Sequence, residues 1–165
     1  MMKKIYNAYR NFRSKVVILF NKLIYKNKFV FGNNFYVRKN FCVVIEENGR
    51  INIGDNVFFN NNCSINSLNS ISIGNNCVFG ENVHIYDHNH KYEKKDIPIN
   101  EQGFNSDKIY IGNNCWIGSN VIILKGVTIG NHCIIGANCV IYEDVEDDSV
   151  LINNQQLKKI KKVVK

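Results

Sequence analysis

Large apolar residues recur at every sixth position through most of this chain, between Phe31 and Ile141. Fourteen positions fit this period in three registers, and all of them carry a large aliphatic or aromatic side chain. Glycine follows eight of the fourteen, and the residue four positions further on is Val, Cys or Phe at twelve of them. The registers are Phe31 and Val37; Ile53, Phe59 and Ile65, continued after one step of eight residues by Ile73, Phe79 and Ile85; and Ile111, Ile117, Ile123, Ile129, Ile135 and Ile141. So regular a pattern indicates one small structural unit repeated along the chain.

This hexapeptide repeat predicts a parallel β-helix. Each hexapeptide supplies one short strand and one turn, and three of them close a triangular coil of 18 residues, as from Ile111 to Ile129. We expect the repeat glycines to allow the tight turns at the corners. Asparagine tolerates left-handed backbone geometry, so we expect that geometry just after these glycines, at Asn33, Asn75, Asn113 and Asn131.

Five of the six cysteines fall at the fourth position after a repeat residue. These five are Cys63, Cys77, Cys115, Cys133 and Cys139. We therefore expect them to fill a narrow core as small apolar side chains. No two cysteines have the C-x-x-C spacing of a zinc ribbon or a redox motif, so the sequence predicts no metal site.

The repeat divides the chain into residues 1–28, 29–146 and 147–165. The middle segment carries the β-helix, interrupted by a polar and charged loop at 91–108 that contains the only proline, Pro98. We expect this loop to leave a corner of the prism and to contribute to function, because loops on rigid scaffolds often carry binding and catalytic residues. The basic C-terminal segment predicts a short helix.

Residues 3–27 have the spacing of an amphipathic helix or a pair of helices, with basic residues between the apolar ones. The apolar positions are Ile5, Tyr9, Phe12, Val16, Leu19, Phe20, Leu23 and Ile24. Such a segment can cover the first coil, which every solenoid needs, or dock on an anionic membrane surface. The two roles are compatible, and the sequence leaves both open.

The net charge of +7 is concentrated at the two ends of the chain. Residues 1–28 carry eight Lys or Arg and no acid, residues 155–165 carry five Lys and no acid, and the remainder has a net charge of −6. This distribution excludes the continuous basic face that nucleic-acid binding requires. With no apolar run of the roughly 18 residues that span a membrane, and no signal peptide, we expect a cytoplasmic protein. It is peripheral at the inner face of the membrane if the N-terminal helix docks there.

The segment IYIGNNCWIGSNVIILKGVTIGNHCIIGANCVIYEDV (Ile109–Val145), preceded by NVHIYDHNH (Asn82–His90), resembles the hexapeptide-repeat acyltransferases. The most similar branch comprises the maltose, galactoside and polysaccharide O-acetyltransferases. This resemblance implies an all-β fold whose coils wind left-handed, against the right-handed rule for parallel crossovers. It also implies a homotrimer with its active sites in grooves between subunits, and acetyl-CoA as the acyl donor.

Alignment with the family pattern places the catalytic base at His90. The reaction needs a group that takes the proton of an attacking hydroxyl, and histidine titrates near neutral pH. His88 is the second candidate, and both lie where the repeat breaks into the loop, whereas His84 and His132 lie on regular coils. Asp87 is expected to steer an imidazole or hold an acceptor hydroxyl, or else to cap a turn.

The resemblance assigns further residues to the substrates. Asn60 matches a position that contacts the acceptor, and Trp116 matches one that lines the acyl and acceptor pocket. Ser119 and Ala137 match positions along the pantetheine arm of CoA. The basic residues expected near the CoA phosphates are Lys125, Lys158 and Lys159. The chain departs from the family where INNQQ replaces a G-x-P-A motif before the terminal helix.

The short chain, with no nucleotide-binding domain, favours O-acetylation of a polysaccharide or lipid-linked glycan. N-acetylation of an amino sugar or small amine is the alternative enzymatic reading. A zinc enzyme of the γ-carbonic anhydrase type shares the fold, but the spacing of His84, His88 and His90 does not match its ligands. A non-catalytic scaffold is the remaining alternative.

Overall fold

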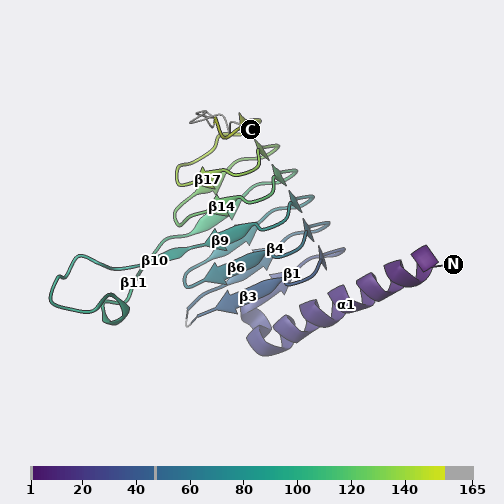
Figure 1. The fold of residues 1–165 in the computed structure, drawn as a ribbon, viewed down its shortest axis with the longest axis horizontal. Coiled ribbons are helices and arrows are strands. Elements are labelled where there is room, and N and C mark those ends of the chain that lie inside the picture. Colours follow the sequence, from purple (N-terminus) through teal and green to yellow (C-terminus); the bar gives the residue numbers. More distant parts are fainter. Residues whose placement is uncertain (1, 47, 155–165) are drawn as a thin grey trace, which may run out of the picture.

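The strands of this protein stack into a triangular β-helix, as the hexapeptide pattern predicts, and the helix is left-handed, as the family resemblance implies (Figure 1). The structure is a computed structural model that describes residues 2–46 and 48–154. The β1 sheet contains β1 (Phe29–Phe31), β4 (Ile51–Ile53), β7 (Ile71–Ile73), β12 (Ile109–Ile111) and β15 (Thr128–Ile129). The β2 sheet contains β2 (Tyr36–Val37), β5 (Phe58–Phe59), β8 (Val78–Phe79), β13 (Trp116–Ile117), β16 (Ile134–Ile135) and β18 (Val150–Leu151). The β3 sheet contains β3 (Cys42–Ile45), β6 (Ser64–Ser67), β9 (His84–Tyr86), β14 (Ile122–Ile123) and β17 (Val140–Ile141).

The three sheets meet at three corners, which are named here for the strands that precede them. The first corner follows the β1-sheet strands and comprises residues 32–35, 54–57, 74–77, 112–115 and 130–133. The second corner follows the β2-sheet strands and comprises residues 38–41, 60–63, 80–83, 118–121 and 136–139. The third corner follows the β3-sheet strands and comprises residues 46, 48–50, 68–70, 87–108 and 124–127. Corner residues of successive coils therefore lie in vertical rows along the prism.

The interior of the prism is filled by the repeat residues. Of the fourteen positions in the six-residue registers, thirteen are buried and only Phe31 is half-buried. Phe59 and Phe79 stack face to face in adjacent coils, with ring centroids 4.1 Å apart. The five cysteines at the fourth position are all buried, whereas Cys42 is exposed. Burial raises the pKa of the Cys63 thiol to about 11, in keeping with a packing role.

The repeat glycines serve a different purpose from the predicted one. Among the described glycines only Gly103 and Gly126 have positive φ, and neither belongs to the repeat. The repeat glycines are needed because the backbone of the next coil passes too close to leave room for a Cβ atom. A Cβ on Gly74, for example, would lie 2.8 Å from the backbone carbonyl carbon and oxygen of Gly112.

The left-handed residue of each first-corner turn lies one position later than predicted. Asn76 and Asn114 have φ of 58° and 57°, whereas Asn75 and Asn113 do not have positive φ. Asn75 and Asn113 instead stack in a ladder, in which the backbone N–H of Asn75 donates to Oδ1 of Asn113 at 2.8 Å. Asparagine is thus used at two successive positions for two different physical reasons.

Replacing Gly74 by alanine is expected to lower the free energy of unfolding by roughly 3 kcal/mol, because the new methyl group collides with backbone that cannot rotate away. Gly103→Ala is the matched control: it has φ of 77° but no atom within 4 Å of the added Cβ. Its cost should be about 1 kcal/mol, that of a left-handed alanine alone. Urea denaturation at a fixed protein concentration measures both. Equal losses would mean that coil spacing does not constrain the repeat glycines.

A single helix, α1 (Met2–Tyr25), precedes the prism and continues into a 3₁₀ turn at Lys26–Lys28. It covers the open end of the first coil, and its side chains form hydrogen bonds to a strand of each sheet. Ser14 Oγ accepts the backbone N–H of Val37 at 2.9 Å, Lys22 Nζ donates to the carbonyl of Phe29 at 2.9 Å, and the Tyr25 hydroxyl donates to the carbonyl of Val43 at 3.1 Å. The helix therefore serves as a lid.

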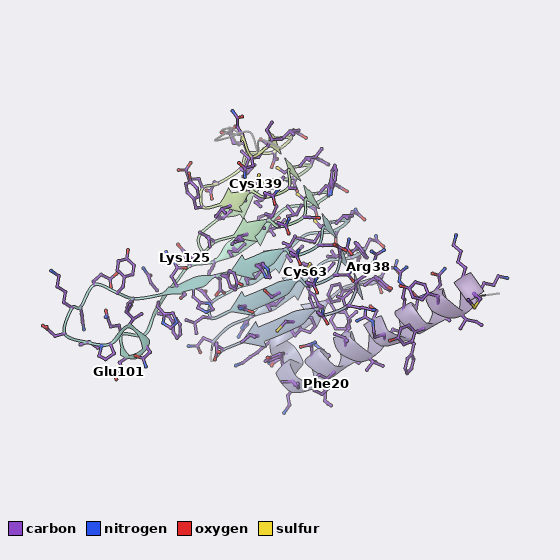
Figure 2. The ribbon with its side chains drawn as sticks, viewed as in Figure 1. Phe20, Arg38, Cys63, Glu101, Lys125 and Cys139 are labelled. Carbon is purple, nitrogen blue, oxygen red and sulfur yellow. The ribbon has the colours of Figure 1, made fainter. Side chains whose placement is uncertain are left out.

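Most of the apolar side chains of α1 lie outside this contact. The helix face toward the prism buries Ser14, Ile18 and Asn21, whereas all eight apolar positions that define its sequence pattern are exposed. Phe20 is 62% exposed and lines an open groove between α1 and residues 40–43 of the first coil (Figure 2). None of the described helices has the length and apolar character that crossing a membrane requires. The predicted C-terminal helix, with Lys158 and Lys159, lies outside the described residues.

Candidate functional site

A two-stranded arm leaves the prism at the third corner, directly after β9 (Figure 1). It consists of β10 (His88–His90) and the antiparallel β11 (Phe104–Ser106), joined by a segment that contains the 3₁₀ turn Ile99–Glu101. In the pairing of the two strands, His88 lies opposite Ser106 and His90 opposite Phe104. The predicted functional loop thus has an ordered base, and both candidate histidines belong to it.

Asp87 is the buried foundation of this arm. Its side chain is completely inaccessible to solvent, and its two carboxylate oxygens accept four hydrogen bonds. The donors are Ser67 Oγ at 2.8 Å, the backbone N–H of Leu68 at 2.7 Å, that of Asn69 at 2.9 Å, and Nδ1 of His88 at 3.0 Å. These donors stabilise a buried carboxylate, which would otherwise be costly to desolvate.

Asp87 therefore caps the turn at Leu68 and Asn69 and contacts the His88 imidazole. Both of its oxygens accept hydrogen bonds within the protein and its side chain is fully buried, while a contact of this residue with an acceptor hydroxyl stays a prediction. A carboxylate can only accept, so Nδ1 of His88 donates this hydrogen bond, and in the neutral imidazole Nε2 is then the acceptor. The His88 side chain, which is 17% exposed, is thus held in one orientation near the surface.

His90 lies two residues further along β10, on the same face of the arm as His88. Its ring centroid is 4.5 Å from that of Phe104, whose ring also meets His88 edge-on at 5.2 Å. His90 is exposed, and none of the hydrogen bonds among the described residues uses its imidazole nitrogens. The arm therefore displays two imidazoles around one phenyl ring, one oriented by a carboxylate and one free to meet a substrate.

The other two histidines occupy ordinary positions on the coils. His84 Nδ1 shares a hydrogen bond of 2.7 Å with Ser64 Oγ on the outer face of the β3 sheet. His132 lies at the first corner, 3.3 Å from an oxygen of the exposed Asp148. Among residues 2–46 and 48–154, no group of three or more His, Cys, Asp or Glu side chains is arranged to hold a metal ion.

The residues assigned to acetyl-CoA and the acceptor lie mainly along a different edge from the histidines. Trp116 is on β13 of the β2 sheet and is 57% exposed. Asn60, Ser119 and Ala137 follow β2-sheet strands at the second corner. Ser119 and Ala137 are neighbours in adjacent coils, since Asn138 donates its backbone N–H to the carbonyl of Ser119 at 2.9 Å. Small side chains along this edge leave backbone groups within reach of a ligand.

Lys125 shares the third corner with the arm (Figure 2). It is half-buried beside Gly126, in the coil above the one from which the arm leaves. The structure therefore brings Asp87, His88, His90 and Lys125 to one corner, and Asn60, Ser119 and Ala137 to another. In a single chain the two groups are separated by the width of the β3 sheet.

Three residues of the site have no counterpart among the sequence-based candidates. Ser67 donates a hydrogen bond to Asp87, and the Phe104 ring packs against the imidazoles of His88 and His90. Arg38 donates from Nη1 to Oδ1 of Asn60 at 2.9 Å. The sequence contains one indication that Phe104 matters, because it is an aromatic residue within a polar loop. It contains no such indication for Ser67 and Arg38, because their partners are twenty or more positions away.

Two family models match the repeats of this chain. The model described as bacterial transferase hexapeptide (six repeats) matches residues 108–143, and that described as hexapeptide repeat of succinyl-transferase matches residues 50–87. A search of curated proteins finds no match. The matched segments include Trp116, Ser119 and Ala137 in the first case and Asp87 in the second.

Solved structures of acetyltransferases are similar to the whole fold. A galactoside acetyltransferase in complex with coenzyme A is 28% identical, with a TM-score of 0.70 over 88% of this chain and 77% of that one. A hexapeptide-repeat acetyltransferase of Vibrio cholerae in complex with acetyl coenzyme A is 25% identical, with a TM-score of 0.68 over 92% and 87% of the two chains. A maltose O-acetyltransferase of Clostridium difficile, 24% identical, shares the fold with a TM-score of 0.56 over 94% and 88%.

Proposed function

We propose that this chain, a hexapeptide-repeat acetyltransferase that uses acetyl-CoA, acetylates a sugar hydroxyl of a polysaccharide or lipid-linked glycan, with His90 as the general base. The observation that carries the proposal is the pair of imidazoles on the arm. His90 has an unoccupied ring on an exposed strand, and the adjacent His88 is held by a buried carboxylate. A base and an oriented acceptor nitrogen side by side suit the activation of a hydroxyl group.

The proposed chemistry is a direct transfer. Acetyl-CoA supplies the acetyl group as a thioester. His90 takes the proton of the acceptor hydroxyl as its oxygen forms the new bond to the acetyl carbon. The carbon–sulfur bond then breaks, and the imidazolium of His90 returns the proton to the departing sulfur. Nε2 of His88, fixed through Asp87, accepts a hydrogen bond from the acceptor and holds it in place.

We propose a homotrimer because the site residues are divided between two corners of the prism. The third corner carries His88, His90 and Lys125, and the second carries Asn60, Ser119 and Ala137. Packing two copies side by side can bring the third corner of one against the second corner of its neighbour. In a closed ring of three, each groove would then receive one set of residues from each of the two subunits that form it.

A membrane-associated acceptor is favoured by the charge and exposure of α1. Residues 1–28 carry eight basic residues and no acid, and the eight apolar side chains of the helical pattern are exposed. An apolar face flanked by cations is the composition of a helix that binds an anionic membrane surface. We therefore place the enzyme at the inner face of the membrane, where lipid-linked glycans are assembled.

Release of CoA thiol from acetyl-CoA, measured against a panel of acceptors, tests the proposal. We expect turnover with neutral oligosaccharides and lipid-linked glycans, and products that lose the acetyl group on mild alkaline treatment, as esters do and amides do not. Turnover confined to amino sugars or amines, with alkali-stable products, would establish the alternative of N-acetylation. A protein that turns over no glycan while it binds acetyl-CoA would overturn the choice of acceptor.

A further inference from the structure

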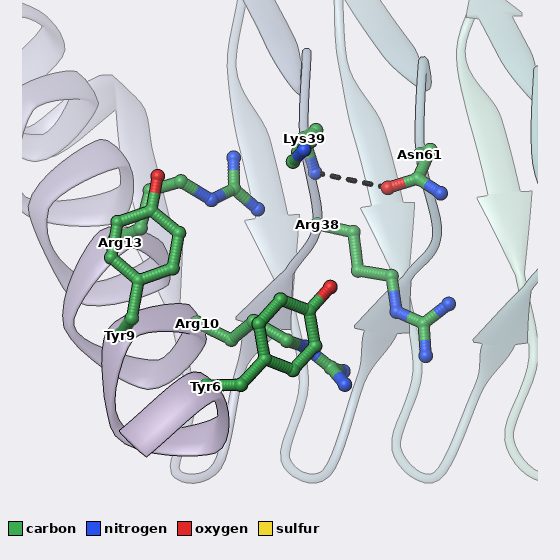
Figure 3. A pocket seen from close by; sticks show the side chains of 7 residues that line it. All are labelled: Tyr6, Tyr9, Arg10, Arg13, Arg38, Lys39 and Asn61. Atoms are coloured by element: carbon green, nitrogen blue, oxygen red, sulfur yellow. Dashed lines mark hydrogen bonds between the residues drawn. The ribbon is translucent and has the colours of Figure 1, made fainter. Parts of the chain in front are cut away.

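A cavity lined by basic and aromatic side chains lies between α1 and the second corner of the first two coils (Figure 3). Its volume is about 270 Å³, close to the lower end of the roughly 300–1,000 Å³ typical of ligand sites. The side chains that give it its character are Tyr6, Tyr9, Arg10, Arg13, Arg38 and Lys39. It is called the basic cavity below, and none of the sequence motifs points to it.

The four cations of the basic cavity have no counter-ion among the described residues. Within residues 2–46 and 48–154, no carboxylate oxygen lies within 4.0 Å of a side-chain nitrogen of Arg10, Arg13, Arg38 or Lys39. Arg10 donates from Nε to the Tyr36 hydroxyl at 3.3 Å, and Arg38 donates to Asn60, so their partners are neutral. Like charges gathered without compensation favour a bound anion.

Two guanidinium nitrogens in this cluster are buried without a hydrogen-bond acceptor. They are Nε of Arg13 and Nε of Arg38, one from α1 and one from the second corner. Buried N–H groups in folded proteins are nearly always paired, and a charged one left unpaired is costly. Both residues line the cavity: in Figure 3 the Arg13 side chain extends from α1 toward the coils, and the Arg38 side chain extends from the second corner along the coils, away from α1.

We propose that the basic cavity binds a phosphate or diphosphate group. Four cations match an anion that carries two or more charges, and guanidinium groups pair with tetrahedral phosphate oxygens by parallel N–H···O bonds. The hydroxyl groups of Tyr6 and Tyr9 offer further donors of hydrogen bonds. A single carboxylate would leave most of the positive charge uncompensated, which makes it the poorer ligand.

The place of the cavity links this group to the proposed acceptor, and this step rests on the proposed function. Arg38 joins the cavity to Asn60, the second-corner residue assigned to the acceptor. The cavity also lies against the N-terminal half of α1, whose exposed apolar residues include Tyr9 and Phe12. A sugar joined to a lipid or a nucleoside through phosphate groups would place its charged linkage here and its sugar toward the groove.

Binding of pyrophosphate, measured by calorimetry and by the rise in thermal unfolding midpoint, tests the site on the intact chain without acetyl-CoA. We expect the wild type to bind and be stabilised. Arg13→Gln and Arg38→Gln should each weaken binding by about tenfold or more. Lys15→Gln is the matched control, because Lys15 is an exposed cation of α1 outside the cavity. Arg13 makes no hydrogen bond that would be lost on substitution, so the unliganded variant should unfold at the wild-type midpoint.

Vesicles distinguish the source of the phosphate. If it belongs to a lipid, binding to phosphatidylcholine vesicles that contain phosphatidic acid should fall in Arg13→Gln and be competed by pyrophosphate. If it belongs to a soluble molecule, pyrophosphate should bind while vesicle binding is the same in Arg13→Gln and Lys15→Gln. The proposal is overturned if pyrophosphate does not bind, or if all three variants weaken its binding equally. Since no assay here measures acetyl transfer, failure of this site is distinguishable from failure of the proposed activity.

Discussion

Replacing His90 by alanine is expected to lower kcat by about 10²- to 10⁴-fold, the loss that follows removal of a general base. The ring is exposed on the arm and packs against Phe104, so its removal leaves the buried foundation of the arm intact. The KM for acetyl-CoA should change little, because the residues assigned to the cofactor lie mainly at another corner. Steady-state release of CoA with an acceptor that the wild type accepts measures both constants.

The matched control is His88→Ala, which removes the neighbouring imidazole from the same strand. If His88 positions the acceptor, its loss should raise the acceptor KM by about tenfold and lower kcat much less. Asp87→Asn should have the same signature, since an amide no longer fixes the imidazole through an acceptor-only group. A larger fall in kcat for His88→Ala than for His90→Ala would exchange the two roles. His88 would then be the base, and Asp87 would be the group that orients it.

The interior of the fold was predictable from the sequence because each hexad position has a single environment. A residue in register always points into the prism, so the pattern of Ile, Phe and Val encodes burial directly, and thirteen of the fourteen positions are buried. The reason for the glycines was not predictable from local preferences. Gly74 is required by the backbone of Gly112, 38 residues later, and no propensity of a single turn contains that contact.

The orientation of α1 was not predictable from its own sequence either, because it depends on contacts with distant residues. Its spacing predicts an apolar face, but which face meets the first coil depends on hydrogen bonds to three different strands. The polar side chain of Ser14 takes the buried position because the backbone N–H of Val37 needs an acceptor there. The eight apolar residues of the sequence pattern are left outside, where they are available to a membrane or to a second copy.

The part of the candidate site that lies in one continuous segment was predictable from the sequence. The part that folding brings together from separate coils was not. His88 and His90 belong to one short motif, and the count of the repeat fixes their place at the base of the loop. The division of the remaining site residues between two corners required the structure. The basic cavity combines residues of α1 with turns from two coils, and such a combination leaves no linear motif.

Mixing two inactive variants is expected to restore about a quarter of wild-type activity if each site draws on two subunits of a closed trimer. One variant is His90→Ala, which damages the third corner. The other is the double variant Asn60→Ala with Trp116→Ala, which damages the second corner and the face beside it. A mixed trimer of either composition contains one groove in which both contributions are intact. Three quarters of randomly assembled trimers are mixed, and one groove in three is active in each.

The measurement is CoA release after the two variants are unfolded together and refolded in equal amounts, with each variant refolded alone as the control. Separately, each should retain only a small fraction of wild-type activity. Restoration needs contact between copies, because no exchange of substrates between two defective sites can supply a missing imidazole. If the mixture is no more active than the separate variants, although light scattering shows trimers, then both corners that form a site belong to one chain. A mixture of monomers without restored activity would remove the intersubunit groove from the proposal altogether.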